Sequence, residues 1–224
     1  MKKLMSNLSI DNVIFGFDKK LKVLLIKHAD GISKGKWALP GGWVTSDESL
    51  DAAASRLLYV LTGLDKVFLE QLKAFGNLNR FPNQRVVTIA YYSLIRSNDV
   101  KILAGFTASE AKWVSLEDVK KLPYDHNTIL DFGLTTLRNK VKQEPIGFNL
   151  LPKQFSLYDL QKIYEAILQI RLDKPNFRRK ILKMGFLTKS PIKQSNVTHR
   201  AAQLYEFDKD MYMKYKKQKF LFDI

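Results

Sequence analysis

The sequence of 224 residues predicts an α+β protein with two structural units. Its first 115 residues hold β-branched and apolar runs typical of strands, and the residues after Leu116 show apolar positions at helical spacing. Two prolines and a glycine interrupt the helical part within residues 143–152. This order predicts a mixed sheet with flanking helices over residues 1–142, a linker over 143–155 and a second domain over 156–224.

The strands of the first unit are predicted from five apolar runs. The first two flank the polar triplet 18–20 and form a predicted hairpin, and the next two are separated by a turn at residues 82–84. The predicted strands are residues 13–17, 21–27, 67–75, 85–95 and 111–115.

Four helices are predicted from apolar spacing and from their end signals. The first begins near Ser46 or Asp47 and ends at Thr62, because Gly63 provides a C-terminal stop. The second spans residues 125–141. The third begins at the N-cap Ser156, and the fourth opens at Asp173 or Lys174 with Pro175 in its first turn and ends at Gly185.

Two short runs, residues 186–189 and 203–207, follow the fourth helix and are predicted to pair around a polar loop. Helix, turn, helix and hairpin is the order of a winged helix-turn-helix. Phe177, Ile181 and Met184 share the inward face of the fourth helix. Asparagine and arginine suit base edges, and lysine suits phosphates. The predicted DNA-binding residues are Lys174, Asn176, Arg178, Arg179, Lys180 and Lys183, with Lys189, Lys193 and Arg200 in the wing.

The net charge of +15 is unevenly distributed. Residues 1–140 carry 20 basic and 14 acidic side chains, whereas residues 141–224 carry 17 and 8. A basic domain of this kind favours an anionic partner, and double-stranded operator DNA fits the helix order. The alternatives are a solvated basic surface and a protein that binds single-stranded RNA, for which we find no exposed aromatic platform.

Composition excludes several other classes. The absence of cysteine excludes a disulfide scaffold, a thiol nucleophile and a thiolate zinc site, and three histidines make a histidine-rich metal site improbable. No apolar run approaches the roughly 20 residues needed to cross a bilayer. We find no signal-peptide pattern, and we therefore expect a cytoplasmic protein without a membrane partner.

Residues 36–64, KWALPGGWVTSDESLDAAASRLLYVLTGL, resemble the Nudix box G-x5-E-x7-R-E-U-x-E-E-x-G-U. Gly42, Glu48, Arg56 and Gly63 take its fixed positions. The glutamates that hold divalent cations in Nudix hydrolases are replaced, and cations of this type need oxygen ligands. The resemblance implies a Nudix-like fold without catalytic residues, metal or cofactor; a residual nucleoside-diphosphate hydrolase is the alternative. The replacing residues are Leu57, Val60 and Leu61.

Further segments are similar to the ADP-ribose pyrophosphatase branch of the Nudix family. Residues 75–94 resemble its strand–turn–strand, with Phe81 where that branch has an acid, and Asp125-His126 resembles the start of its last helix. A degenerate Nudix domain followed by a basic winged helix is the architecture of the Nudix-related transcriptional regulators. One branch senses ADP-ribose-like nucleotides, and another, in Bacteroidetes, senses L-arabinose. Because residues 144–157 and 74–94 are similar to the second branch, we expect a regulator that responds to a pentose such as L-arabinose, with ADP-ribose as the alternative effector.

In a Nudix fold the ligand lies between the sheet and the box loop. A sugar needs polar partners for its hydroxyls and an apolar face for its ring. The candidate residues also have structural explanations: Trp37 and Tyr91 suit a hydrophobic core, Asp125 suits a helix cap, and His126 suits a structural hydrogen bond. We expect a homodimer that reads a palindromic operator. The predicted effector-binding residues are Lys27, Trp37, Asn77, Asn79, Arg80, Tyr91, Asp125 and His126.

Overall fold

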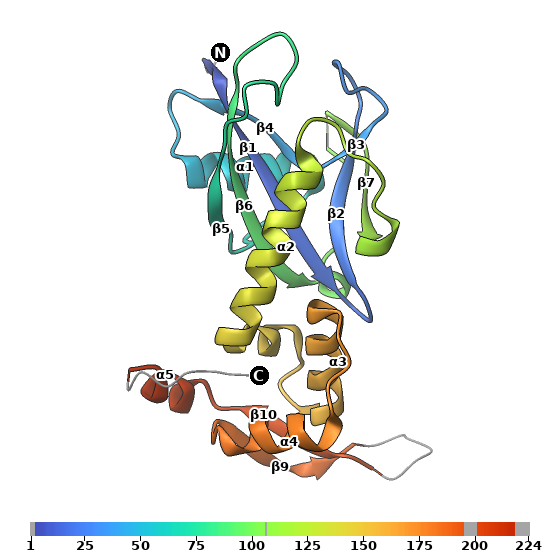
Figure 1. The fold of residues 1–224 in the computed structure, drawn as a ribbon, viewed down its shortest axis with the longest axis vertical. Helices are drawn as coiled ribbons and strands as arrows, with labels where there is room; N and C mark the ends of the chain where they lie inside the picture. The colour runs from blue at the N-terminus through green and yellow to red at the C-terminus, as the bar shows by residue number, and fades with distance from the viewer. Residues whose placement is uncertain (1–2, 106, 195–200, 218–224) are drawn as a thin grey trace. The chain divides into compact units, whose positions relative to one another are not determined.

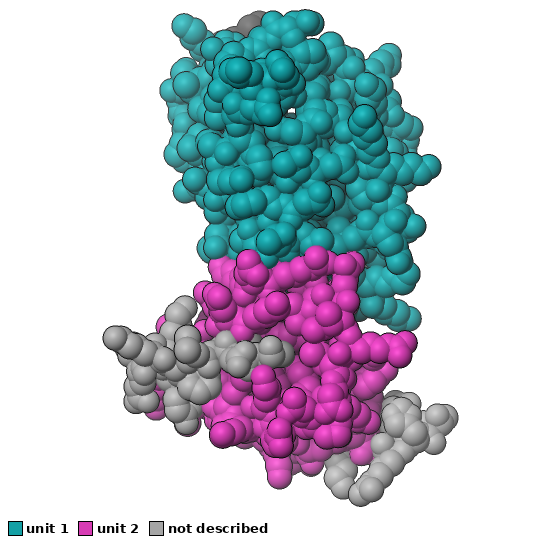
Figure 2. Space-filling view, in the orientation of Figure 1, with its two compact units in different colours: residues 1–136 teal, residues 137–224 magenta. Residues whose placement is uncertain are grey.

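The computed structural model describes residues 3–105, 107–194 and 201–217. The chain divides into two compact units, residues 1–136 and 137–224, so the division falls within helix α2 (His126–Gln143) (Figure 2). The predicted α+β class is confirmed, because the first unit is built on a mixed sheet and the second joins helices to a small sheet. No helix among the described residues is long and apolar enough to cross a membrane.

The sheet of the first unit is centred on one long strand, β1 (Leu4–Phe17), which pairs parallel with β6 (Val87–Arg96) and antiparallel with β2 and β4. The predicted hairpin is confirmed, with Phe17 opposite Leu21. The strand starts at Leu4 rather than at residue 13, because its first half, which mixes apolar and polar residues, pairs with β4 and β6. The remaining strands are β2 (Leu21–His28), β3 (Trp37–Ala38), β4 (Gly41–Thr45), β5 (Glu70–Phe75) and β7 (Ala108–Ser115).

Helix α1 (Leu50–Thr62) packs on one face of this sheet, where Ala53, Ala54 and Leu57 join Ile10 in a buried cluster. Its N-cap is Ser49, whose hydroxyl accepts from the Ala52 amide, so the helix starts three residues later than the sequence predicted. The predicted stop is confirmed, because Gly63 adopts a φ of +72° that glycine accommodates without strain.

Helix α2 lies on the opposite face of the sheet (Figure 1). A Cβ at Gly133 would lie 3.3 Å from Val13 Cγ1, and the Phe132 ring meets Phe75 at 5.8 Å between centroids. Two short 3-10 turns, η1 (Ser97–Asp99) and η2 (Leu116–Asp118), complete the unit. The sheet is therefore sandwiched between α1 and α2.

The second unit holds helices α3 (Leu157–Leu168) and α4 (Lys174–Lys183). Ser156 caps α3 in a capping box with Asp159, and Asp173 caps α4, as predicted. The predicted hairpin is confirmed as β9 and β10, and strand β8 adds a third strand beside β10. Strands β4 and β8 and helix α5 were not predicted from the sequence. The bounds are β8 (Phe155–Ser156), β9 (Leu187–Lys193), β10 (Gln203–Phe207) and α5 (Lys209–Lys217).

The prolines and glycine that predicted a linker lie within the second unit. Residues Pro145–Leu150 form the 3-10 helix η3, and Phe148 is buried there. Its ring stacks on Phe207 at 4.5 Å and meets Phe155 and Phe186 at 5.6 and 6.1 Å. The segment therefore forms part of the aromatic core of the second unit.

Candidate effector pocket and basic helix

A pocket of about 220 Å³ opens in the first unit, where β1, the start of β4 and the start of α2 converge. Gly41 permits this approach, because a Cβ there would lie 2.4 Å from both the Ile10 carbonyl oxygen and Asp11 Oδ1. Residues 28–33 and the turn at Arg80-Phe81 complete the wall. The pocket is lined by Ser9, Asp11, His28, Asp30, Gly31, Ile32, Ser33, Leu39, Gly41, Gly42, Trp43, Arg80, Phe81, Val86, Tyr124 and His126.

Arg80 is the central charged group of this pocket, and its side chain is only 3% exposed. Its Nε and Nη2 atoms donate to the two oxygens of Asp125, at 3.0 and 2.8 Å. Its Nη2 also donates to Asp11 Oδ2 at 3.1 Å. The guanidinium is thereby held in one orientation by carboxylates from β1 and from the start of α2.

His126 and Asp11 form a second buried contact beside Arg80. The Leu39 amide donates to His126 Nδ1 at 3.1 Å, and His126 Nε2 lies 3.3 Å from Asp11 Oδ1. Because Nδ1 accepts a hydrogen bond, the ring proton belongs on Nε2, which faces the carboxylate. Burial raises the pKa of Asp11, but His126 and the Arg80 guanidinium outweigh that effect and hold the pKa below its ordinary value. Asp11 is therefore ionised at neutral pH.

The opposite side of the pocket is aromatic. The rings of Phe81 and Tyr124 stack at 5.0 Å with 28° between their planes, and Trp43 meets Phe81 edge-on at 5.7 Å. Ser33 donates to the Tyr124 hydroxyl at 2.8 Å and fixes that ring. The pocket therefore presents an apolar aromatic wall across from a charged network, an arrangement suited to a ligand with a planar ring and polar substituents.

His28 provides a polar group that the protein itself leaves unpaired. Within the described parts of the chain its Nε2 atom is buried and has no hydrogen-bond partner. Burial and the nearby His126 lower the pKa of His28 below its ordinary value, so the ring is neutral at pH 7. A buried unpaired nitrogen costs about 1–3 kcal/mol, which a hydrogen bond from a ligand would recover.

The structure brings together only part of the predicted effector set. Arg80 and His126 line the pocket and Asp125 orients Arg80, whereas Lys27, Trp37, Asn77, Asn79 and Tyr91 do not line it. The Lys27 ammonium pairs with Glu110 at 2.7 Å, and Trp37 lies under the Lys112 ammonium. The Asn77 side chain accepts from the Asn79 amide on an exposed turn, and the Tyr91 hydroxyl donates to Asp51 at 2.6 Å beside the α1 core.

The sequence analysis did not select several lining residues, Asp11, His28, Trp43 and Tyr124 among them. Asp11 could have been recognised as a candidate from the sequence, because it stands beside the apolar strand run at 13–17. A carboxylate buried in such a strand needs a cation or a hydrogen-bond donor as a partner. Phe81 was noticed only as a departure from the pyrophosphatase pattern, and the structure places that ring in the aromatic wall.

The box residues occupy the positions that the resemblance implied. Arg56 Nε and Nη2 donate to the two Glu48 oxygens at 2.8 and 2.6 Å, and the Thr45 amide donates to Glu48 Oε1. The Arg56 hydrogen bonds lower the pKa of Glu48 to about 2. Leu57 and Leu61 are buried, and Val60 is exposed. No group of three or more candidate metal-ligating side chains occurs among the described residues.

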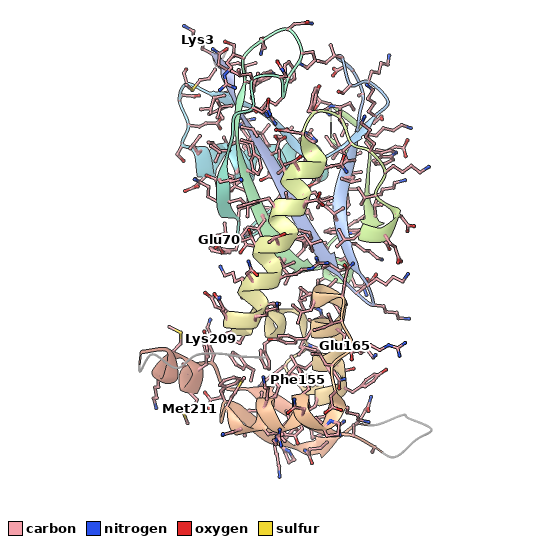
Figure 3. The ribbon with its side chains drawn as sticks, in the orientation of Figure 1. Lys3, Glu70, Phe155, Glu165, Lys209 and Met211 are labelled. Atoms are coloured by element: carbon pink, nitrogen blue, oxygen red, sulfur yellow. The ribbon has the colours of Figure 1, made fainter. Side chains whose placement is uncertain are left out.

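Helix α4 of the second unit carries the basic face that the sequence predicted. Phe177, Ile181 and Met184 are buried, which confirms the predicted inward face. Glu165 lies on α3 (Figure 3). It accepts from the Leu172 amide at 3.1 Å and from Gln161 at 3.0 Å, so its carboxylate holds the turn before α4 in place. Helix α4 is therefore held in place by its buried face and by the turn before it, and its basic face points outward.

The predicted DNA-binding residues lie on or beside this outward side. Arg179 Nη2 donates to Asn176 Oδ1 at 2.7 Å, and both side chains are exposed. Lys174, Lys183 and Lys189 are exposed, and Arg178 and Lys180 are half-buried. The Lys193 side chain and Arg200 lie outside what the structure describes.

Comparison with known proteins matches both units. Residues 5–132 match the NUDIX domain family, and residues 147–207 match the NrtR DNA-binding winged helix domain. The chain is 36% identical over 206 residues to the "ADPR responsive transcriptional repressor NtrR" of Acinetobacter baylyi, covering 89% of this chain and 81% of the relative.

Two solved structures are similar to this chain, one over both units and one over the first unit. The crystal structure of Shewanella oneidensis NrtR complexed with a 27mer DNA is 28% identical, with a TM-score of 0.73, over 92% of this chain and 95% of that one. The NUDIX domain of the same protein, complexed with ADP ribose, is 31% identical with a TM-score of 0.55, over 58% of this chain and 88% of that one. The chain therefore belongs to the NrtR-like family of transcriptional regulators, in which a Nudix domain is followed by a DNA-binding winged helix domain.

Proposed function

We propose that this protein is an ADP-ribose-responsive transcriptional repressor, with the pocket of the first unit as the effector site and α4 as the DNA-reading helix. The similarity to the Acinetobacter baylyi repressor over most of both chains carries this proposal. The NUDIX domain relative complexed with ADP ribose supports the choice of effector. The relatives favour ADP-ribose over L-arabinose, which rested on the resemblance of residues 144–157 and 74–94 to the second branch.

The chemistry of the pocket supports a nucleotide-like ligand. The adenine ring of ADP-ribose has the planar surface that the wall of Trp43, Phe81 and Tyr124 accommodates. A sugar hydroxyl is a suitable donor to the unpaired Nε2 of His28, and Asp30 adds an exposed carboxylate at the rim. Arg80 already binds two carboxylates. We therefore propose that it holds the walls of the pocket in position and is not the single cation that neutralises the diphosphate of ADP-ribose.

We further propose that the protein does not hydrolyse its effector. Leu57, Val60 and Leu61 offer no oxygen ligand to a divalent cation. The remaining box carboxylate, Glu48, is bound bidentately by Arg56. An assay for AMP and ribose 5-phosphate, the products of hydrolysing ADP-ribose at its diphosphate bond, in excess magnesium tests this assignment, and turnover that Glu48→Gln abolishes would contradict it.

Regulation requires that ADP-ribose prefer one conformation of the protein, because a ligand shifts an equilibrium only by its differential affinity. A homodimer that places two copies of α4 on a palindromic site agrees with the two-fold symmetry typical of such regulators. We propose that ADP-ribose favours the conformation with lower operator affinity, so that binding relieves repression.

Calorimetric titration of the full chain with ADP-ribose and with L-arabinose tests the effector assignment. We expect saturable binding of ADP-ribose at one site per chain and no measurable heat from the pentose. ADP and ribose 5-phosphate serve as partial ligands, and both should bind more weakly because each lacks part of the molecule. Binding of L-arabinose alone would overturn the assignment and restore the pentose hypothesis.

A further inference from the structure

A second pocket lies in the first unit and shares no lining residue with the effector pocket. Its volume is about 350 Å³, within the range of small-molecule sites. Strands β2 and β7 form its floor, where Leu25 lies directly opposite Lys112 in the pairing register. Residues 35–37 and 118–122 form its sides. The pocket therefore lies at an edge of the sheet, on a different set of elements from the effector site.

The charge of this second pocket is strongly positive. Four lysines and one carboxylate, Asp118, line it, and all four lysine side chains are exposed. None of the four makes a salt bridge within the described residues, whereas the neighbouring Lys27 is neutralised by Glu110 at 2.7 Å. The four lysines are Lys36, Lys112, Lys120 and Lys121.

One of these cations is held in place by an aromatic ring. Lys112 Nζ lies 4.1 Å from the centre of the Trp37 ring, within the range of a cation–π contact. The contact orders the ammonium at the wall of the pocket, where Lys112 makes no salt bridge of its own within the described part of the chain and interacts only electrostatically with Glu110, the partner of Lys27. The same ring forms part of the pocket lining, so a ligand meets an ordered cation beside an aromatic surface.

We propose that this pocket binds a small anion with a terminal diphosphate group, which ADP-ribose lacks because both of its phosphates are esterified. Clustered lysines repel one another, and a ligand with several negative charges relieves that repulsion better than a monovalent anion does. Lysine ammonium groups are suitable point-charge partners for phosphate oxygens. Free pyrophosphate and the terminal diphosphate of a nucleotide such as ADP share this chemistry. The site is separate from the proposed ADP-ribose site and does not depend on it.

Calorimetry with the full chain tests the proposal, with sodium pyrophosphate as the probe in the presence of saturating ADP-ribose. We expect pyrophosphate to bind at one site per chain under this condition. The variant Lys112→Ala/Lys120→Ala should weaken binding about tenfold or more. The matched control Lys19→Ala/Lys101→Ala removes the same charge at two exposed positions outside the pocket and should change the affinity less than about twofold.

A parallel titration with ADP identifies the source of the diphosphate. Tighter binding of ADP, weakened by the same pocket variant, supports a nucleotide, and equal affinities support the free diphosphate. The proposal is overturned if pyrophosphate does not bind, if ADP-ribose displaces it, or if both double variants lose affinity equally. A pocket variant that weakens DNA binding and leaves pyrophosphate binding unchanged would also overturn it. Pyrophosphate is also titrated into the protein without ADP-ribose. Binding that the pocket variant weakens is then measured even if ADP-ribose does not bind the first pocket, so the two proposals can fail independently.

Discussion

Arg80 joins the first strand of the Nudix-like unit to the start of its last helix: Nη2 lies 3.1 Å from Asp11 Oδ2 and 2.8 Å from Asp125 Oδ1. His126 approaches the other Asp11 oxygen at 3.3 Å. Two neighbouring residues, Asp125 and His126, therefore anchor the start of α2 to β1 through one buried carboxylate. The residues that shape the effector pocket therefore also stabilise the fold, because the same buried contacts hold α2 against β1.

Arg80→Ala should destabilise the protein by about 3–5 kcal/mol, because it leaves Asp11 buried without its cation. Chemical denaturation monitored by tryptophan fluorescence measures the change. Arg85→Ala is the control, since Arg85 is exposed and, within the described part of the chain, its side chain donates to the Asn77 carbonyl alone. Equal stability of the two variants would contradict the structural role of Arg80.

Glu48→Gln should lower the free energy of unfolding at pH 7, with an effect that disappears in acid. The pKa of Glu48 is about 2 in the folded protein against an ordinary value of 4.5, chiefly because of Arg56. The stabilisation is present above pH 4.5 and is lost as the pH falls toward 2. The shift corresponds to about 3 kcal/mol, which solvent screening reduces because one third of the Arg56 side chain is exposed. A difference between wild type and variant that is as large at pH 2 as at pH 7 would contradict this account.

Phe81→Ala should weaken ADP-ribose binding by about 1–2 kcal/mol, because it removes one face of the aromatic stack with Tyr124. Calorimetry with the purified variant measures the loss. Phe68→Ala provides the matched control, since Phe68 is 79% exposed and lies outside the pocket. If both variants bind ADP-ribose as the wild type does, the aromatic wall has no role in recognition.

Arg179→Ala should weaken operator binding by about 1–3 kcal/mol if the guanidinium reads a base edge. Asn176→Ala should reproduce part of the loss, because the Asn176 side chain accepts from Arg179 at 2.7 Å and orients it. A fluorescence-anisotropy titration with operator and random duplexes measures both. A loss of equal size on random DNA would assign Arg179 to phosphate contact instead.

Lys183→Ala should weaken binding to operator and random duplexes alike, because an exposed lysine at the end of α4 suits a phosphate. The slope of log affinity against log salt concentration should fall by about one. Repeating the anisotropy titration over a range of salt concentrations gives this slope. An unchanged slope would remove Lys183 from the interface.

The sequence predicted those features that depend on neighbouring residues. The hairpin at residues 18–20, the stop at Gly63 and the N-cap at Ser156 each follow from a few adjacent side chains. The effector pocket was predicted only in part, because strand pairing brings together residues far apart in the chain. Asp11 reaches Arg80 across 69 positions, and Tyr124 reaches Ser33 across 91.

Two other features were missed for similar reasons. Strand β8 has two residues, and it is defined by pairing with β10 rather than by a pattern of its own. Residues 145–150 carry the prolines and glycine typical of a linker, yet Phe148 makes them part of an aromatic core assembled from Phe155, Phe186 and Phe207.

The most direct test of the central claim is a DNA-retardation titration of the full-length protein on the upstream region of its own gene. Increasing ADP-ribose should release the retarded band, and L-arabinose at the same concentrations should leave it unchanged. Release by L-arabinose alone, or specific retardation that neither compound alters, would contradict an ADP-ribose-responsive repressor.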